Sequence, residues 1–190
     1  MLPQNSPNHH ENTELLSRIA TDEHVFEEIV RTYEKPLYNH LIRLTGNVDE
    51  AGDLLQKTFI RLYNWRDRIE KDGNLKNWLY KVSTNLAYDF FRKKKRENLA
   101  PLNDQADDET IYPELTYSSL EHDISVIDLE NALREIEPHY KNILLLYYRE
   151  GFSYEEIAHL LEIPLNTVKT HIRRAKQALA ALLNETYGTN

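Results

Sequence analysis

Apolar residues in the first half of the chain recur at three- and four-residue steps, the spacing of one face of an α-helix. They predict a helix over residues 26–44, with a break or kink at Pro36 because proline has no amide hydrogen. Gly46 suits the end of that helix, and Asn47 with Glu50 three residues later predicts a new helix start. The first half therefore predicts successive helices.

Two more helices complete the predicted first domain. The helix that follows Asn47 carries four apolar residues on one face, which are Ala51, Leu55, Phe59 and Leu62. Residues 66–74 are polar and include a glycine, so they predict a loop. Residues 75–96 predict a long helix whose inward residues are Leu75, Trp78, Leu79, Val82 and Leu86. Residues 21–97 can thus bury one core, after a polar N-terminal tail at residues 1–20.

The second half divides into a linker and a second domain. Residues 98–124 contain two prolines, many acids and no sustained period, which predicts a flexible acidic linker. In residues 125–190 a helix is expected before Pro138, which suits the first position of the next helix. That next helix contains the apolar run at residues 143–148 and ends at Gly151. No strand alternation is present, so the predicted fold is all-α, with two small helical domains.

The second domain ends in a pattern typical of a helix-turn-helix. Ser153 and Glu156 form a predicted capping box, and Pro164 can open a second helix after a short turn. On that helix one face is apolar, made of Leu165, Val168, Ile172, Ala175 and Leu179. The opposite face is polar, made of Asn166, Thr167, Thr170, Arg173, Arg174 and Gln177. Such a face suits entry into a DNA major groove.

The distribution of charge supports this interpretation. The chain carries −8 in total, but residues 97–137 hold twelve acids and one arginine, so the remainder carries +3. Residues 92–96 form an unbroken basic run, and the polar helix face lacks the interleaved acids of an ordinary solvated helix. A solvated surface helix is the alternative interpretation of that face. The charge pattern favours contact with nucleic acid.

Other classes of protein are disfavoured. The chain has no cysteine, which removes disulfides, thiolate nucleophiles and cysteine-ligated zinc. The histidines are scattered, and no metal-binding, phosphate-loop or nucleophile-elbow motif is present, so we expect no enzyme, metal or cofactor. The N-terminal residues lack a signal-peptide pattern, and no apolar run could span a bilayer. A cytoplasmic protein without membrane insertion is expected.

Three segments resemble bacterial RNA polymerase sigma factors. The sequence from Leu133 to Leu179, which includes "YEEIAHLLEIPLNTVKTHIRRAKQAL", resembles their C-terminal promoter-binding domain. "DEAGDLLQKTFIRLYNW" resembles their polymerase-binding helix, and "NLKNWLYKVSTNLAYDFFRKKKR" resembles their promoter-opening helix. Two domains and a short linker are similar to the extracytoplasmic-function group. The chain departs from the family at Glu162 and Asn166, where glycine is common, and at His171, where arginine is usual.

The resemblance implies a sigma factor that binds core RNA polymerase, directs it to promoters and is held by an anti-sigma factor. Residues 21–97 would bind the polymerase and open the −10 element, with loop 66–74 holding a flipped base, and residues 125–190 would read the −35 element. The implied polymerase contacts are Asp49, Asp53, Gln56, Lys57 and Ile60. The predicted DNA contacts are Lys76, Lys81, Asn85, Asp89, Arg92, Lys93, Arg96, Asn166, Thr167, Lys169, Thr170, His171, Arg173, Arg174 and Lys176.

Ile60 has support from the residues themselves, because an apolar side chain ringed by polar groups suits an interface anchor. Single exposed isoleucines are nevertheless common. Two alternative functions stay open. "TVKTH" also resembles the DNA-binding domain of LuxR-type regulators. An adaptor would bind polymerase without initiating transcription.

Overall fold

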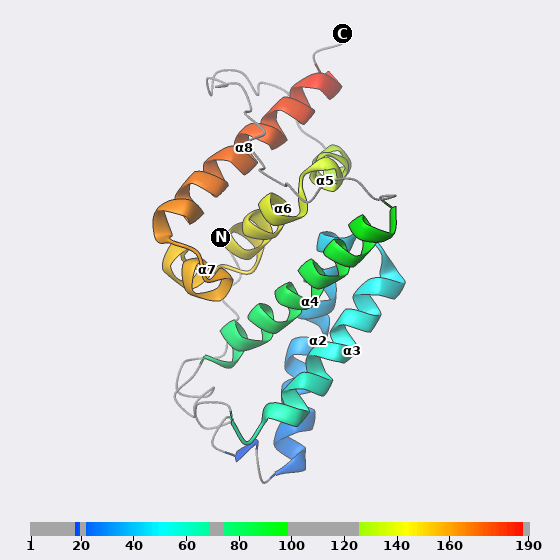
Figure 1. The fold of residues 1–190 in the computed structure, drawn as a ribbon, viewed down its shortest axis with the longest axis vertical. Helices are drawn as coiled ribbons and strands as arrows, with labels where there is room; N and C mark the ends of the chain where they lie inside the picture. The colour runs from blue at the N-terminus through cyan, green and yellow to red at the C-terminus, as the bar shows by residue number, and fades with distance from the viewer. Residues whose placement is uncertain (1–17, 20–21, 69–73, 99–125, 188–190) are drawn as a thin grey trace. The chain divides into compact units, whose positions relative to one another are not determined.

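A computed structural model describes residues 18–19, 22–68, 74–98 and 126–187, and every regular element in them is helical (Figure 1). The elements in chain order are α2 (Glu23–Thr45), α3 (Val48–Trp65), α4 (Leu75–Asn98), α5 (Val126–Glu135), α6 (Pro138–Leu144), η1 (Leu145–Arg149), α7 (Tyr154–Leu161) and α8 (Leu165–Tyr187). The all-α prediction is confirmed. Internal contacts divide the chain into two compact units, Met1–Phe90 and Phe91–Asn190. The predicted linker lies outside the described residues except at its first position.

The first unit is built on an antiparallel pair of helices, α2 and α3. Only Gly46 and Asn47 connect them, and each residue caps one helix end. Gly46 adopts a left-handed conformation with φ 69°, and its N–H donates to the Ile42 carbonyl at 2.8 Å. The Asn47 side-chain oxygen accepts from the backbone N–H groups of Asp49 at 2.9 Å and Glu50 at 3.1 Å. Both predicted helix boundaries are confirmed.

Pro36 does not end a helix. α2 continues through it from Glu23 to Thr45, so of the break or kink that the sequence predicts, the break does not occur. Buried residues on both sides of the proline explain this, since Tyr33 and Leu37 lie on the same inward face. Packing of that face outweighs the one backbone hydrogen bond that proline cannot make.

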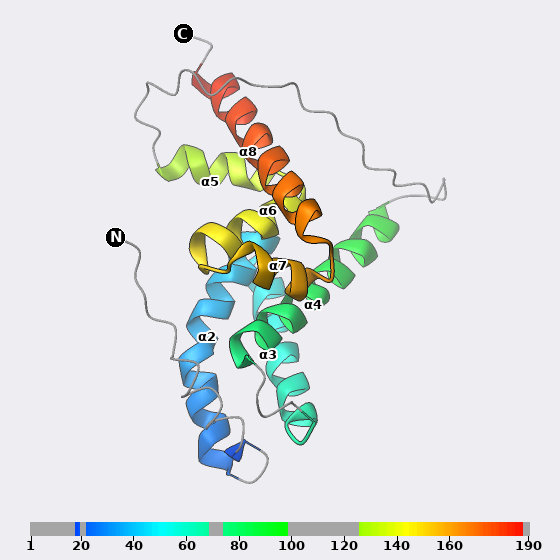
Figure 2. The same cartoon turned by 90° about the vertical axis from the view of Figure 1, so that its left-hand side faces the viewer.

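α4 lies beside the α2–α3 pair in both views (Figures 1 and 2). Leu75, Leu79 and Leu86 are buried as predicted. Trp78 and Val82 were predicted to face the core but are only half-buried. Tyr80 is buried instead and packs edge-on against His40 of α2, with ring centroids 5.2 Å apart. The inward face of α4 is therefore rotated from the predicted one, toward the side of the helix that carries Tyr80, whose ring contacts α2.

The second unit has one core beneath its C-terminal helix. α5, α6 and α7 all pack against α8. One cluster of that core consists of the buried residues Ile136, Tyr140, Leu144 and Ala175, against which Leu133, Leu179 and Leu182 pack. Pro138 occupies the start of α6 as predicted. The α-helix ends at Leu144, within the apolar run, and the chain continues as η1, a π-helical turn that the hydrophobic pattern did not predict.

Candidate functional site

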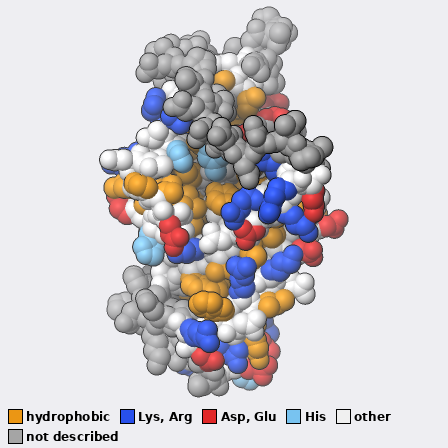
Figure 3. All heavy atoms as spheres, in the orientation of Figure 1, with side chains coloured by type: hydrophobic (Ala, Val, Ile, Leu, Met, Phe, Trp, Pro, Cys, Tyr) orange, Lys and Arg blue, Asp and Glu red, His pale blue; other side chains and the backbone are white. Residues whose placement is uncertain are grey.

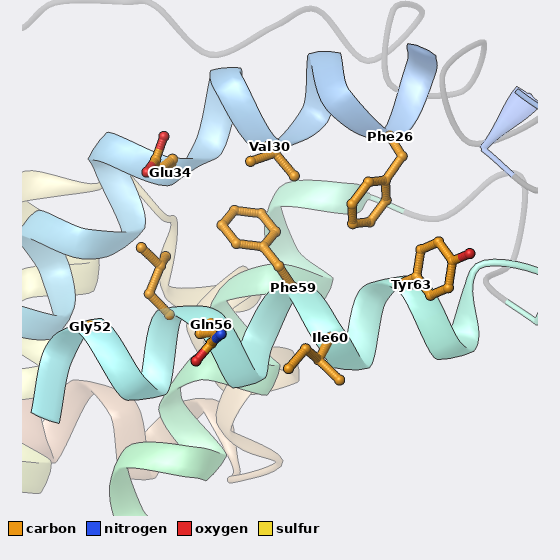
Figure 4. A pocket seen from close by; sticks show the side chains of 9 residues that line it. Phe26, Val30, Glu34, Gly52, Gln56, Phe59, Ile60 and Tyr63 are labelled. Atoms are coloured by element: carbon orange, nitrogen blue, oxygen red, sulfur yellow. The ribbon is translucent and has the colours of Figure 1, made fainter. Parts of the chain in front are cut away.

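An open apolar groove of about 420 Å³ lies between α2 and α3 (Figure 4). Phe26 and Val30 of α2 and Phe59 of α3 point into the space between the two helices, and Ile60 lies at its edge. The full lining consists of Phe26, Val30, Glu34, Gly52, Leu55, Gln56, Phe59, Ile60 and Tyr63. A surface of this kind presents apolar area to a partner without being part of the core.

The groove corrects the predicted inner face of α3. Leu55 and Phe59 were predicted to be core residues, but both are half-buried and line the groove. The buried face of α3 instead consists of Ala51, Leu54, Thr58 and Leu62. The apolar stripe of α3 is wider than one packed face requires, so it supplies the core on one side and the groove on the other. That width was the signal available in the sequence.

At one end of the groove, Phe26 of α2 and Tyr63 of α3 contact each other (Figure 4). The Phe26 and Tyr63 rings meet edge to face with centroids 5.4 Å apart. The Arg66 guanidinium carbon lies 4.0 Å from the Tyr63 ring centroid, and one of its nitrogens donates to the Tyr63 carbonyl at 2.5 Å. These contacts hold Tyr63 at the groove. Phe26 and Val30 are therefore candidate contact residues that sequence reasoning missed, since they lie on α2 and not on the predicted docking helix.

The five predicted polymerase contacts are all exposed on α3. Ile60 is 52% exposed, so it lies off the core as predicted. Gln56 and Ile60 belong to the groove lining. The other three, Asp49, Asp53 and Lys57, lie on the same helix outside the lining. The helix thus presents an apolar groove with charged residues nearby, which is the composition of an interface core and its rim.

The predicted DNA contacts of the first domain lie along α4. Lys76 and Lys81 are half-buried, and the Lys76 ammonium lies 6.0 Å from the Tyr80 ring centroid. The exposed members are Asn85, Asp89, Arg92, Lys93 and Arg96. Lysine and arginine side chains gather over α4 in Figure 3. Most of the predicted base-holding loop, residues 69–73, lies outside the described residues.

The helix-turn-helix forms as its sequence signals predict. The Ser153 N–H donates to the Glu156 carboxylate at 2.8 Å, and the Glu156 N–H donates to the Ser153 hydroxyl at 3.2 Å, which completes the capping box. The turn begins at Glu162, which adopts a left-handed conformation with φ 57°. The Ile163 N–H donates to the Ala158 carbonyl at 3.1 Å. Glu162 therefore holds a conformation that favours glycine.

The outer face of α8 agrees largely with the prediction. Val168, Ile172 and Ala175 are buried. The exposed predicted contacts are Asn166, Lys169 and Arg173, and the half-buried ones are Thr167, Thr170, His171, Arg174 and Lys176. The Thr170 hydroxyl donates to the Asn166 carbonyl at 2.9 Å. Arg173 thus has the freedom to reach a base edge.

His171 lies elsewhere than on that outer face. Its ring packs edge-on against the buried Tyr140 of α6 at 5.5 Å between centroids, and lies 5.7 Å from the His139 ring. The helical period explains this, since His171 is three residues after the buried Val168 and flanks the inner face. His171 is therefore placed as a packing residue of the α6–α8 contact.

Tyrosines gather near the other flank of α8. Tyr147 packs against both Tyr148 and Tyr154 with centroids 4.8 Å apart in each case. Burial raises the pKa of the Tyr154 hydroxyl, and a hydrogen bond with Tyr147 raises it further. The Lys176 ammonium lies 5.3 Å from the Tyr148 ring centroid. This group of side chains was not singled out by the sequence pattern.

The described residues contain no cluster of three or more His, Cys, Asp or Glu side chains that could hold a metal ion. None of the helices that the structure describes is long and apolar enough to cross a membrane.

Comparison with known proteins identifies two matching segments of the chain. Residues 29–97 match the family model for sigma-70 region 2, and residues 127–179 match that for sigma-70 region 4. The chain is 32% identical over 171 residues to the ECF RNA polymerase sigma factor SigW of Bacillus subtilis, covering 86% of this chain and 91% of the relative. It is 34% identical over 158 residues to SigE of Mycolicibacterium smegmatis, covering 81% of this chain and 60% of the relative.

Among solved structures, the sigma factor RpoE from Bartonella quintana, in complex with the anti-sigma factor NepR, matches with a TM-score of 0.64 and 26% identity. That match covers 84% of this chain and 96% of the other. The CnrH structure, in complex with the cytosolic domain of CnrY, has a TM-score of 0.67 at 17% identity, covers 92% of this chain and 97% of the other, and supports the fold. The family comprises DNA-binding regulators of transcription initiation rather than enzymes. The chain belongs to the extracytoplasmic-function group of RNA polymerase sigma factors.

Proposed function

We propose that this sigma factor docks on core RNA polymerase through the α2–α3 groove and contacts promoter DNA through α4 and α8. The observation that carries the proposal is the groove, because Phe59 and Ile60 leave apolar area unburied beside exposed charged residues of α3. A polymerase element with an apolar stripe would bury that area. Asp49, Asp53 and Lys57 would then contact the polymerase at the rim, and Gln56 within the groove.

Helix α4 is also proposed to open the promoter near the start site. Along α4, Arg92, Lys93 and Arg96 would contact phosphates, with Lys76 and Lys81 nearer its start. Asn85 can both donate and accept, so it suits contact with an exposed base, and Asp89 can accept from a base amino group.

The second unit is proposed to read the upstream element as duplex DNA. Arg173, Arg174 and Thr170 would face base edges from α8, while Lys169, Lys176, Asn166 and Thr167 would fix its register on the backbone. His171, which packs on Tyr140, is assigned an indirect part in holding α8 in place.

One further partner follows from the family. The related RpoE structure holds an anti-sigma factor, and we propose that a protein of that class controls this chain also. Polymerase and promoter DNA as partners imply action in the cytoplasm.

Run-off transcription with core RNA polymerase tests the proposed function. Addition of the chain should produce specific transcripts from a subset of genomic promoters, where core polymerase alone gives none. A LuxR-like regulator would bind duplex DNA yet leave core polymerase inactive and unbound. An adaptor would bind core polymerase in a titration yet support no promoter-specific transcript. Either pattern would contradict the proposal.

A further inference from the structure

Lys176 differs from the other cations of α8 because an aromatic ring lies beneath it. Its ammonium is 5.3 Å from the centroid of Tyr148, which belongs to η1 and not to the helix-turn-helix. Tyr148 is 49% exposed, so its ring has no large share in the core. The attraction between a cation and the face of an aromatic ring holds the two side chains together. Lys176 is also half-buried, whereas Lys169 is exposed.

Tyr148 is itself held in place from the other side. Its ring meets Tyr147 at an interplanar angle of 85°, and Tyr147 in turn packs against Tyr154, the first residue of α7. The capping box at Ser153 and Glu156 fixes the start of that helix. Three rings thus connect the first helix of the helix-turn-helix to one lysine on the second. The π-helical turn of η1 carries two of these rings next to each other.

We propose that Tyr148 is a positioning residue for DNA binding, which orients the Lys176 ammonium toward the phosphate backbone. A free lysine side chain has many rotamers and loses that freedom when it binds a phosphate. A lysine already held over a ring loses less, so each contact it makes contributes more to affinity. Tyr148 then acts through Lys176 and reads no base itself. This inference rests on the proposed function of α8.

The test is a double-mutant cycle on the full-length chain. Tyr148→Ala, Tyr148→Phe, Lys176→Ala and the double variant are titrated against a promoter duplex and a random duplex by fluorescence anisotropy at several salt concentrations. Tyr148→Ala should weaken both duplexes about 2- to 5-fold. Tyr148→Phe should keep wild-type affinity because it keeps the ring. Lys176→Ala should reduce by about one the magnitude of the slope of log affinity against log salt concentration.

The decisive comparison is between the double variant and Lys176→Ala, which gives the effect of Tyr148→Ala in the absence of the lysine. Tyr148→Ala should change affinity by less than about 1.5-fold when Lys176 is already alanine, because the ring then has nothing to orient. Equal losses with and without Lys176 would overturn the inference, as would a loss in Tyr148→Phe or no effect of Lys176→Ala. Thermal unfolding of each variant separates these results from loss of fold. Failure of the wild-type chain to bind promoter duplex in any background would instead contradict the proposed function.

Discussion

The α2–α3 groove and the outer face of α8 are both exposed surfaces with a proposed partner, but they differ in chemistry. The groove is apolar, with Val30, Leu55 and Phe59 in its lining. The outer face of α8 is polar, with Asn166, Lys169 and Arg173 exposed. A polar face opposite an apolar one is visible in the sequence, whereas an apolar groove has the same residue types as the core. One surface could therefore be assigned residue by residue, and the other required the packed structure.

The largest expected effect tests whether the groove is a docking surface. Ile60→Asp should weaken binding to core RNA polymerase by about 2 kcal/mol or more, because it places a charge in an apolar contact. Trp65→Asp is the matched control, since Trp65 lies on the same helix outside the groove and is also 52% exposed. Binding titrations with core polymerase measure both. Similar losses in the two variants would show that general apolar exposure on α3 matters and the groove does not.

The next prediction concerns the polar surface. Arg173→Ala should weaken binding to the promoter duplex by about 1–3 kcal/mol, because a base contact is lost. The difference in affinity between promoter duplex and random duplex should therefore become smaller. Lys169→Ala should weaken both duplexes alike and reduce the salt slope by about one, because a phosphate contact is lost. Anisotropy titrations at several salt concentrations distinguish them. Parallel losses in Arg173→Ala would assign this helix to the backbone only.

A smaller effect is expected at the turn that positions α8. Glu162→Gly should stabilise the fold by about 1 kcal/mol, because glycine adopts the left-handed conformation without the steric cost that other residues carry. Glu162→Ala keeps that cost and should give no gain. Chemical denaturation followed by circular dichroism gives the free energy of unfolding of each. A gain in both variants would place the effect in the glutamate side chain and not in the backbone.

The smallest effect is expected from a substitution in the groove lining. Gly52 lies within α3 at the groove, and a Cβ added there meets no atom within 4 Å. Gly52→Ala should therefore raise the free energy of unfolding by about 0.5–1 kcal/mol, because alanine loses less backbone entropy in a helix. The same variant sharpens the docking comparison. Core polymerase affinity measured alongside stability would fall only if the partner approaches the helix closely at this position, and a decrease in stability would contradict the open geometry.

The sequence by itself determined several helix boundaries and the polar outer face of α8. Gly46, Asn47, Pro138 and the Ser153–Glu156 box act through their own neighbouring backbone groups, so their roles are visible without a fold. The helical period also predicted three buried residues of α8, which are Val168, Ile172 and Ala175. The order of motifs likewise pointed to the family that the comparisons confirm.

Tertiary packing decided the rest, because it depends on which neighbour each side chain meets. A helical period gives the direction of a residue but not how much of a wide apolar stripe another helix covers, so Leu55 and Phe59 were assigned to the core and lie in the groove. The helix through Pro36 and the burial of Tyr80 follow from contacts across helices. His171 packs on Tyr140, and Lys176 lies over Tyr148, through residues more than 25 positions away in the chain. Local signals specify where helices begin and end, and only their packing determines which faces remain available to a partner.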